Sequence, residues 1–306
     1  MNVKQTTPIR TAEANRLRRY ATYSAILVAS CLIAFKTVAW FMTGSIAVLS
    51  SLMDSFLDFG TSILIFYAVR KAQIPPDPGH RFGHSKAEPV AAMTEGAILL
   101  GSAVFLVMEA LRRFIDPHVV ENLDAAFAVM AVSLGATLGL VLFQSFVVLR
   151  TRSVAIKADL ANYKGDLFSN SLVIGSLFAT QTFGYTWIDP LAGILIAMYL
   201  LYISKSIIMD TLHELMDAEL PAKQRKRISD IIMAHPEVID FHDLRTRRAG
   251  QDFFIELHLE LKGNLTLRDA HIITDDVERE IRSEFNNSFV TIHQEPAGID
   301  DERDAF

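Results

Sequence analysis

Six long apolar stretches fill the first part of this chain and limit the folds that it can adopt. They cover residues 20–42, 44–69, 90–114, 125–149, 154–180 and 188–208 of the 306. A helix needs about 20 mostly apolar residues to cross the hydrocarbon core of a bilayer, and each stretch is of that order. After residue 210 the pattern becomes that of ordinary amphipathic elements. The sequence therefore predicts an all-α transmembrane domain of six helices, followed by a soluble domain.

Two aspartates interrupt the second apolar stretch. Asp54 and Asp58 are four residues apart, so their side chains point to the same face of a helix. An ionised carboxylate at membrane depth costs roughly 2.5 to 3.5 kcal/mol, so it needs a partner or a water-filled path. A cation is a suitable partner, and the pair predicts one half of a metal site.

The fifth stretch repeats the polar pattern of the second. When 153–166 is aligned with 45–58, Asn162 takes the place of Asp54 and Asp166 takes the place of Asp58. Such internal symmetry is common in transporters, which bind substrate between the repeats. The four residues therefore predict one site between two helices. The alternative is a pair of polar helices that are held together by hydrogen bonds.

Basic residues predict the orientation in the membrane. They gather before the first stretch, between the second and third, and around the junction of the fourth and fifth. Because Lys and Arg are enriched in cytoplasmic loops, we expect both termini on the cytoplasmic side of the inner (cytoplasmic) membrane. The expected parts are a cytoplasmic tail over 1–19, a six-span domain in the lipid bilayer over 20–210, and a cytoplasmic soluble domain over 211–306.

The chain has one cysteine, Cys31, which limits its metal chemistry. It has no partner for an internal disulfide, and there is no CxxC pair for a thiolate zinc site. The remaining ligand types are carboxylate, imidazole and amide. They admit zinc, iron(II), manganese and cadmium more readily than copper(I). We expect no organic cofactor, and nothing in the sequence resembles a nucleic-acid-binding module.

A second candidate site lies in the loop after the second stretch. Asp77, His80 and His84 combine ligand types that suit a first-row metal, and the neighbouring Gly79 and Gly83 let the chain fold around an ion. A solvated charged loop is an equally good interpretation of this spacing.

The sequence of the soluble domain predicts the element order α-β-β-α-β. This order is typical of an open-faced sheet with helices on one side. The expected elements are a helix over 221–234, strands over 243–250 and 252–261, a helix over 266–285 and a strand over 289–293. Alternation places His258, His293 and Glu295 on the polar face of the sheet. With His242 before the first strand and His271 on the second helix, they are candidates for one surface metal site. The alternative is a set of separately solvated histidines.

Motifs along nearly the whole chain resemble those of one known family. They are DxxxD at 54–58, the aspartate at 166, the loop DPGHRFGHSKAEP, and the runs HDLRTRRAGQDFFIELHLEL and TIHQEP. With the six spans, they resemble the cation diffusion facilitator family, in particular its bacterial ferrous-iron and zinc efflux branch. The resemblance implies a homodimeric antiporter that exchanges a divalent metal for protons and has a metallochaperone-like cytoplasmic domain. It implies transport by residues 20–210 and adds metal binding and dimerisation to the domain over 211–306.

The resemblance also implies roles for individual residues. The implied transport ligands are Asp54, Asp58 and Asp166, and the implied loop ligands are Asp77, His80 and His84. The implied dimer-bridging site of the cytoplasmic domain holds His242, His258, His271 and His293. Lys86 and Asp217 are implied to form a charged interlock between the domains at the dimer interface.

Two positions depart from the pattern of that branch. Glu295 replaces an aspartate and keeps the carboxylate. Asn162 replaces a histidine, which leaves an all-oxygen transport site and relatively favours manganese or iron(II) over zinc and cadmium. The change also removes an imidazole as a proton carrier, so proton coupling falls on the three aspartates, with Glu95, His80 or His84 as further candidates.

The sequence therefore predicts a metal/proton antiporter that works by alternating access. A channel is expected to show flux without proton dependence. An intramembrane enzyme needs a nucleophile and a base, and no HExxH or GxSxG motif is present. The nearest alternative is a membrane-anchored metal sensor, which has no need of the three aspartates.

Overall fold

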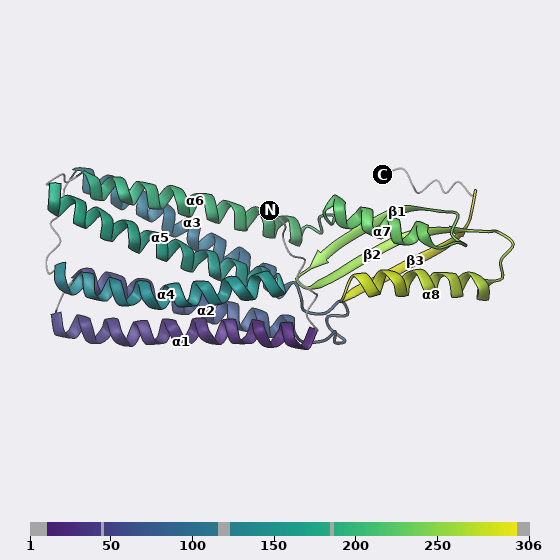
Figure 1. The fold of residues 1–306 in the computed structure, drawn as a ribbon, viewed down its shortest axis with the longest axis horizontal. Helices are drawn as coiled ribbons and strands as arrows, with labels where there is room; N and C mark the ends of the chain where they lie inside the picture. Colours follow the sequence, from purple (N-terminus) through teal and green to yellow (C-terminus); the bar gives the residue numbers. More distant parts are fainter. Residues whose placement is uncertain (1–10, 44–45, 116–122, 184–186, 299–306) are drawn as a thin grey trace. The chain divides into compact units, whose positions relative to one another are not determined.

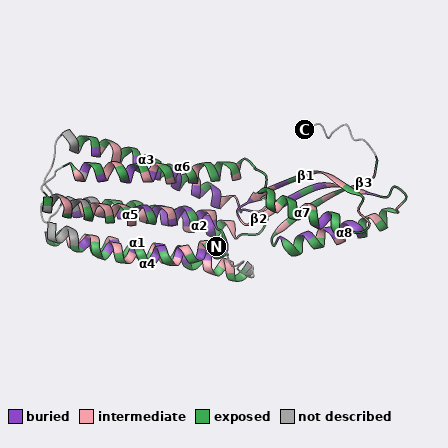
Figure 2. Ribbon diagram, turned by 45° about the horizontal axis from the view of Figure 1, so that its top comes forward, coloured by how far each residue is buried: buried purple, intermediate pink, exposed green. Residues whose placement is uncertain are grey.

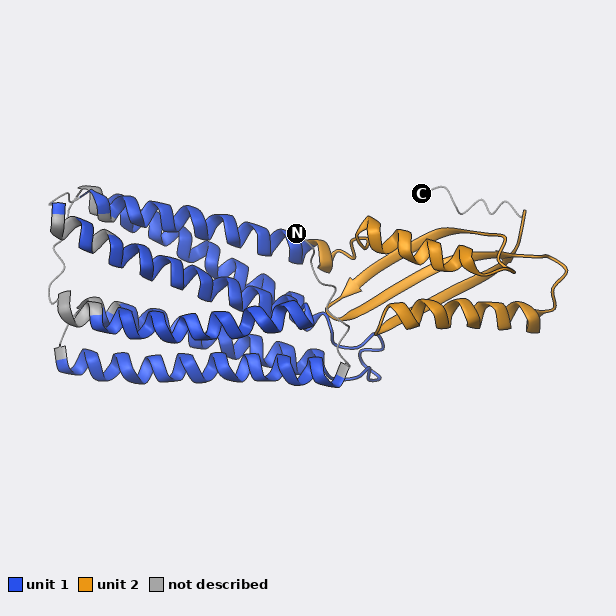
Figure 3. Ribbon diagram, in the orientation of Figure 1, with its two compact units in different colours: residues 1–212 blue, residues 213–306 orange. Residues whose placement is uncertain are grey.

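The computed structural model describes residues 11–43, 46–115, 123–183 and 187–298. The first ten residues of the predicted N-terminal tail, and Gly44 and Ser45 at the start of the second predicted span and of its repeat, lie outside this part. The chain divides into two compact units, Met1–Leu212 and His213–Phe306, which are coloured separately in Figure 3. Each unit is described by itself.

Long helices make up the first unit (Figure 1). They are α1 (Thr11–Thr43), α2 (Ile46–Ala72), α3 (Ala87–Ile115), α4 (Leu123–Thr151), α5 (Val154–Phe183) and α6 (Ile188–Leu215). Five of them, all except α5, contain a segment long and apolar enough to cross a membrane. The less apolar helix, α5, carries Lys157, Asp159, Lys164 and Asp166 within its 30 residues.

The helices of this unit are packed closely through small residues. Helix α1 packs on α2 and α4, and α5 packs on α3 and α4. The buried positions of α1 include Ala21, Ala25 and Ala29, which allow neighbouring helices to approach. Large apolar side chains such as Phe105 and Tyr202 are exposed instead, as expected of a surface that faces lipid, and Figure 2 shows the alternation of buried and exposed positions along each helix.

One buried polar contact joins three helices of this unit. Glu88 at the start of α3 pairs with Arg18 of α1 and accepts a hydrogen bond of 2.5 Å from Ser153 Oγ, just before α5. Glu88 is fully buried, so both partners compensate a charge that water cannot reach. The contact fixes α1, α3 and α5 relative to one another at this end of the bundle.

The second unit is a three-stranded sheet with two helices. Its elements are α7 (Ala222–Ala234), β1 (Asp240–Ala249), β2 (Asp252–Leu261), α8 (Leu267–Glu284) and β3 (Ser288–Pro296). The strand order is β1-β2-β3, with β1 antiparallel and β3 parallel to β2. Both helices pack on the apolar face of the sheet, where Ile232 and Val277 meet Leu257. The predicted fold class, a helical membrane domain followed by an α-β-β-α-β domain, is confirmed.

The start of β1 differs from the prediction. The strand begins at Asp240 and not at Asp243, so His242 lies inside it and pairs with His258. The register shifts between His242 and Arg245, where two residues of β1 face one of β2. This is a β-bulge, and Asp243 occupies its left-handed position with φ 48°. Because the bulge interrupts the alternation of polar and apolar residues, the first residues of β1 were not predicted as strand.

Candidate metal sites

Helices α2 and α5 bring two of the four predicted transport residues, Asp58 and Asn162, into contact. Among the residues that the structure describes, Asp54, Asp58 and Asp166 do not form a group whose ligand atoms all lie within 4.8 Å of one another. Asn162 Nδ2 donates a hydrogen bond of 3.1 Å to Asp58 Oδ1, which joins the two helices directly. The negative charges of Asp54 and Asp58 both act on Asp166. Asp58 and Asp166 are half-buried, whereas Asp54 is exposed. Three carboxylates and one amide can bind a cation only through oxygen atoms. Such ligands suit a hard or borderline divalent cation.

A lysine lies beside these acids, and the sequence assigned it no role. The side chain of Lys36 on α1 is 5% exposed, and its Nζ donates to Ser55 Oγ at 2.8 Å and to the Ser51 carbonyl at 3.0 Å. Both acceptors flank Asp54 on α2. The positive charge of Lys36 acts on Asp58, Asp54 and Asp166. The group therefore compensates part of the negative charge of the cluster.

A second polar layer lies next to the transport residues, and only its Glu95 was predicted from the sequence, as a candidate for proton coupling. The layer consists of Glu95 on α3, Gln144 on α4 and Asp159 on α5, all almost completely buried. The sequence held a signal for it, because Asp159 stands three residues before Asn162 and so shares its helix face. The apparent repeat drew attention to Asn162 and Asp166 alone.

The loop residues form a compact cluster between α2 and α3. Asp77 Oδ1 accepts hydrogen bonds from the backbone N–H groups of His80 at 2.7 Å and Gly79 at 2.9 Å. His84 Nε2 lies 3.2 Å from Asp77 Oδ2, and His80 Nδ1 lies 3.4 Å from Oδ1. One ligand atom of each of the three residues lies within 4.8 Å of the others, so the residues fit a metal ion.

The environment of each ligand prepares the loop for a cation. His84 Nδ1 lies 3.3 Å from the Ile74 carbonyl, which orients the ring so that Nε2 faces Asp77. The backbone N–H of His80 and then that of Gly79 stabilise the carboxylate, so the pKa of Asp77 is lowered from its usual value. The aspartate is therefore ionised whenever the histidines can bind metal.

The polar face of the sheet gathers a second cluster. His242 pairs with His258 across β1 and β2, and His258 pairs with His293 across β2 and β3. Their ring centroids are 5.0 and 4.9 Å apart. Glu295 Oε1 lies 2.6 Å from His258 Nδ1 and 3.4 Å from His293 Nε2, while Oε2 lies 3.5 Å from His242 Nε2. Ligand atoms of His242, His258 and Glu295 lie within 4.8 Å of one another.

Three other predicted residues lie elsewhere. His271 is on α8, where its Nε2 lies 3.6 Å from Asp275 Oδ2, and the structure does not bring it to the sheet cluster. Asp217 accepts a hydrogen bond of 3.3 Å from Arg247 within the second unit. Lys86 belongs to the first unit. The roles predicted for these residues stay predictions.

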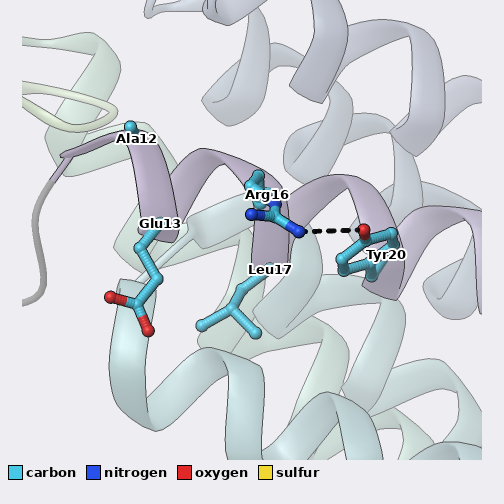
Figure 4. A pocket seen from close by; sticks show the side chains of 5 residues that line it. All are labelled: Ala12, Glu13, Arg16, Leu17 and Tyr20. Atoms are coloured by element: carbon cyan, nitrogen blue, oxygen red, sulfur yellow. Dashed lines mark hydrogen bonds between the residues drawn. The ribbon is translucent and has the colours of Figure 1, made fainter.

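A surface pocket near the start of α1 differs from these clusters in its lining residues. It has a volume of about 480 Å³ and is lined by Ala12, Glu13, Arg16, Leu17 and Tyr20 (Figure 4). Arg16 donates to the Tyr20 hydroxyl at 3.4 Å. A lining with a single carboxylate does not provide the ligands of a metal site.

The fold and its sites define a class of protein: a helical membrane transporter of cations with a small appended domain. The chain belongs to the cation efflux family, because residues 22–216 match its transmembrane domain and residues 220–297 match the cytoplasmic domain of cation efflux proteins. The predicted resemblance is confirmed.

Relatives from two bacteria cover nearly the whole chain. A protein of Shewanella oneidensis named cation-efflux pump FieF is 40% identical over 282 residues, which are 92% of this chain and 95% of the relative. The protein of that name in Yersinia pestis is 37% identical over 279 residues, or 91% and 93%. The metal-bound C-terminal domain of the CzcD transporter from Thermotoga maritima is 31% identical and covers 26% of this chain and 93% of that one, with a TM-score of 0.25. The family assignment rests on the sequence matches.

Proposed function

We propose that this protein exports divalent transition-metal ions in exchange for protons, by alternating access of a site between α2 and α5. The observation that carries the proposal is the hydrogen bond from Asn162 to Asp58 beside Asp54 and Asp166, because it links two membrane helices at a group of carboxylates. Intramembrane acids of this kind mark ion pathways. Relatives named cation-efflux pump support the direction of transport.

The exchange follows from competition for the same oxygens. A hydrated cation enters from the cytoplasm, replaces water by the side chains of α2 and α5, and displaces protons from the aspartates. Movement of the helices exposes the site to the opposite side, where protons return to the carboxylates and release the metal. Cation and protons cannot occupy the site together, and this exclusion couples their movements.

The side chain of Asn162 supports a preference among the candidate cations zinc, iron(II), manganese and cadmium. An amide oxygen is a harder ligand than an imidazole nitrogen. The preference therefore shifts towards manganese and iron(II). The affinity for zinc and cadmium falls the most, because these two ions bind nitrogen ligands well.

The two clusters outside the transport site support a regulatory role. Asp77, His80 and His84 fit a metal ion in the cytoplasmic loop, and His242, His258 and Glu295 fit one on the sheet, with His293 beside Glu295. Metal bound to the loop stabilises the first unit, and metal bound to the sheet stabilises the second unit, of a homodimer in the inner membrane. Lys86 and Asp217 remain candidates for the interlock, and His271 for an additional ligand. Both termini are cytoplasmic in this proposal.

A membrane-anchored metal sensor is the second candidate, because the sheet cluster by itself can report metal concentration. It leaves Asp54, Asp58 and Asp166 without a role. Flux that depends on these aspartates therefore excludes the sensor.

The test is metal-driven proton movement in proteoliposomes, measured with zinc, iron(II), manganese and cadmium. The native chain is expected to move protons against metal and to prefer manganese or iron(II). Asn162→His is expected to gain zinc transport. A native chain that moves metal without protons contradicts antiport, and a native preference for zinc that Asn162→His leaves unchanged contradicts the role of the asparagine.

A further inference from the structure

Glu95, Gln144 and Asp159 form a buried layer of polar side chains in the helical unit. The three residues are 0%, 0% and 1% exposed and come from three different helices. Gln144 Nε2 donates a hydrogen bond of 2.6 Å to Asp159 Oδ2. The other carboxylate oxygen of Asp159 and both oxygens of Glu95 have no hydrogen-bond partner among the residues that the structure describes. Unpaired acceptors at such depth are costly unless their charge is neutralised.

The layer lies next to the transport site. Asp159 precedes Asn162 by three residues, which is about 4.5 Å along the helix axis, and the two share a face of α5. The charge of Asp58 acts on Asp159 and also on Glu95, and the charge of Asp159 acts on Glu95. The charge in the transport site therefore reaches both carboxyl groups.

The surroundings of the layer contain acids and neutral groups. On α5 the acids near Glu95 are Asp159 and Asp166, and on α2 the acid is Asp58. Ser62 of α2 and Tyr163 of α5, joined at 2.9 Å, face Asp159. Where α6 approaches α3, beside Glu95 at Gly96, it brings the apolar Ile207 and Ile208. Where α1 approaches α5, beside Leu160, it brings the apolar Ala25 and Val28. The groups that act most strongly on Glu95 are thus acidic, and they do not neutralise it.

We infer that Glu95 and Asp159 form a proton-binding pair, separate from the metal ligands, which releases protons when a divalent cation enters the transport site. With that site empty, acidic neighbours and burial favour the neutral carboxylic acids. A bound cation adds positive charge nearby and favours the carboxylates, so the carboxyl O–H bonds break and the protons leave to water. When the metal departs, protons return from water. The inference rests on the proposed antiport.

A second metal ion fits the layer less well than protons do. The layer offers two carboxylates and one amide, fewer than the four ligands that zinc takes in closed sites. A proton needs only one carboxyl oxygen.

The experiment is calorimetric titration of the purified full chain with manganese in buffers of different ionisation enthalpy, which gives the number of protons released per metal ion. The variants are Glu95→Gln, Asp159→Asn and the double variant, which keep side-chain size. The control is Glu109→Gln on the same helix. The expected result is metal binding with native stoichiometry and about one proton fewer per substituted carboxyl group, while the control matches the native chain.

Native proton release in the double variant overturns the inference. A lower number of metal ions bound per chain also overturns it, because the layer is then a metal site. If Asp159→Asn does not give a folded protein, Glu95→Gln decides alone, since the carboxylate of Glu95 makes no hydrogen bond within the described residues whose loss could unfold the chain. Failure of the proposed function is recognised separately, as absence of proton movement by the native chain in proteoliposomes.

Discussion

The transport residues and the sheet cluster gather metal ligands by different means. On the sheet, His242, His258 and His293 stand in one row because backbone pairing places them opposite one another. In the helical unit, Asp58 and Asn162 meet because two helices pack side by side, and one hydrogen bond joins them. Strand register cannot change without breaking the sheet, whereas helices can shift with little loss. The comparison indicates a fixed site for holding metal and an adjustable site for moving it.

The largest expected effect is the loss of metal flux when a substitution disrupts the helical site alone. Asp58→Asn keeps the shape of the side chain but removes the charge that attracts the cation. Losing a group that only orients a metal ligand costs about 10- to 100-fold, so losing the ligand itself is expected to lower metal flux in proteoliposomes by at least about 100-fold. Asp210→Asn, at an exposed aspartate of α6, is the control. Substantial flux through Asp58→Asn contradicts the proposed site.

The next largest effect is the loss of stabilisation by metal when substitutions disrupt the sheet cluster alone. His258→Ala with His293→Ala removes two ligands, so metal is expected no longer to raise the thermal unfolding temperature of the full chain. The native chain gains about 2.7 kcal/mol when free metal is about 100-fold above its dissociation constant. His235→Ala, at the end of α7, is the control. If the cluster regulates transport, the double variant also changes the transport rate at low metal. Unchanged transport counts against regulation.

Helix packing is the property on which the helical site depends, and Gly96 tests it. A Cβ atom there would lie 2.9 Å from Ile208 Cγ1 and 3.2 Å from Ile207 Cγ2. Gly96→Ala is therefore expected to destabilise the first unit by about 1–3 kcal/mol in thermal unfolding. Gly101→Ala on the same helix meets nothing within 4 Å and is expected to be neutral or stabilising. Equal effects of the two substitutions contradict close packing of α3 on α6.

Lys36 distinguishes the two sites further, because it supplies the helical site with a positive charge. Lys36→Met removes a charge that opposes binding of a divalent cation. Metal affinity is expected to rise by at least about fivefold, because two unit charges about 4 Å apart repel by about 1 kcal/mol even in water, and repulsion between a buried lysine and a divalent cation is screened less. Lys205→Met, on the exposed side of α6, is the control for calorimetry. Weaker binding in Lys36→Met indicates that the lysine instead keeps the ligands in place.

The smallest expected effect concerns the loop cluster, which resembles the sheet site in being fixed by backbone contacts. Because the folded pKa of Asp77 lies below its usual 3.8, its contribution to loop stability is present above that pH and is lost as pH falls through the lower folded pKa. Protection of the Gly79 and His80 amides in hydrogen exchange, corrected for intrinsic rates, is expected to stay constant from neutral pH to about pH 4. Asp77→Ala, which removes the acceptor oxygen, is expected to remove the protection at every pH. Protection that already declines at pH 5 in the native chain contradicts this assignment.

The sequence predicted the elements well because hydrophobic length and alternation are local signals. The spans, the helix and strand order of the second unit and the polar face of β2 all follow from them. Where a contact depended on packing between helices, the sequence was less informative. Lys36 and Gln144 are single polar residues in apolar stretches, and neither pattern nor spacing says which neighbour they reach.

The candidate sites were predictable to different degrees. Asp77, His80 and His84 are close in the chain, so a short loop must keep them near one another. Glu95 and Asp159 come from helices that are distant in sequence, and only the packed bundle brings their charges together. His242 was assigned to the loop before β1, because one extra residue in the strand interrupts the alternation on which such predictions depend.

That extra residue allows the length of β1 and the position of its ligands to vary separately. Asp243 and Leu244 together span one position of β2, so Phe241 lies opposite Leu259 on the core side and His242 lies opposite His258 in the metal cluster. Strict alternation back from Arg245 through Leu244 and Asp243 would turn His242 into the apolar interior. Loss of one codon within the bulge would instead leave His242 opposite His258, so a shortened gene would still encode the row of three histidines.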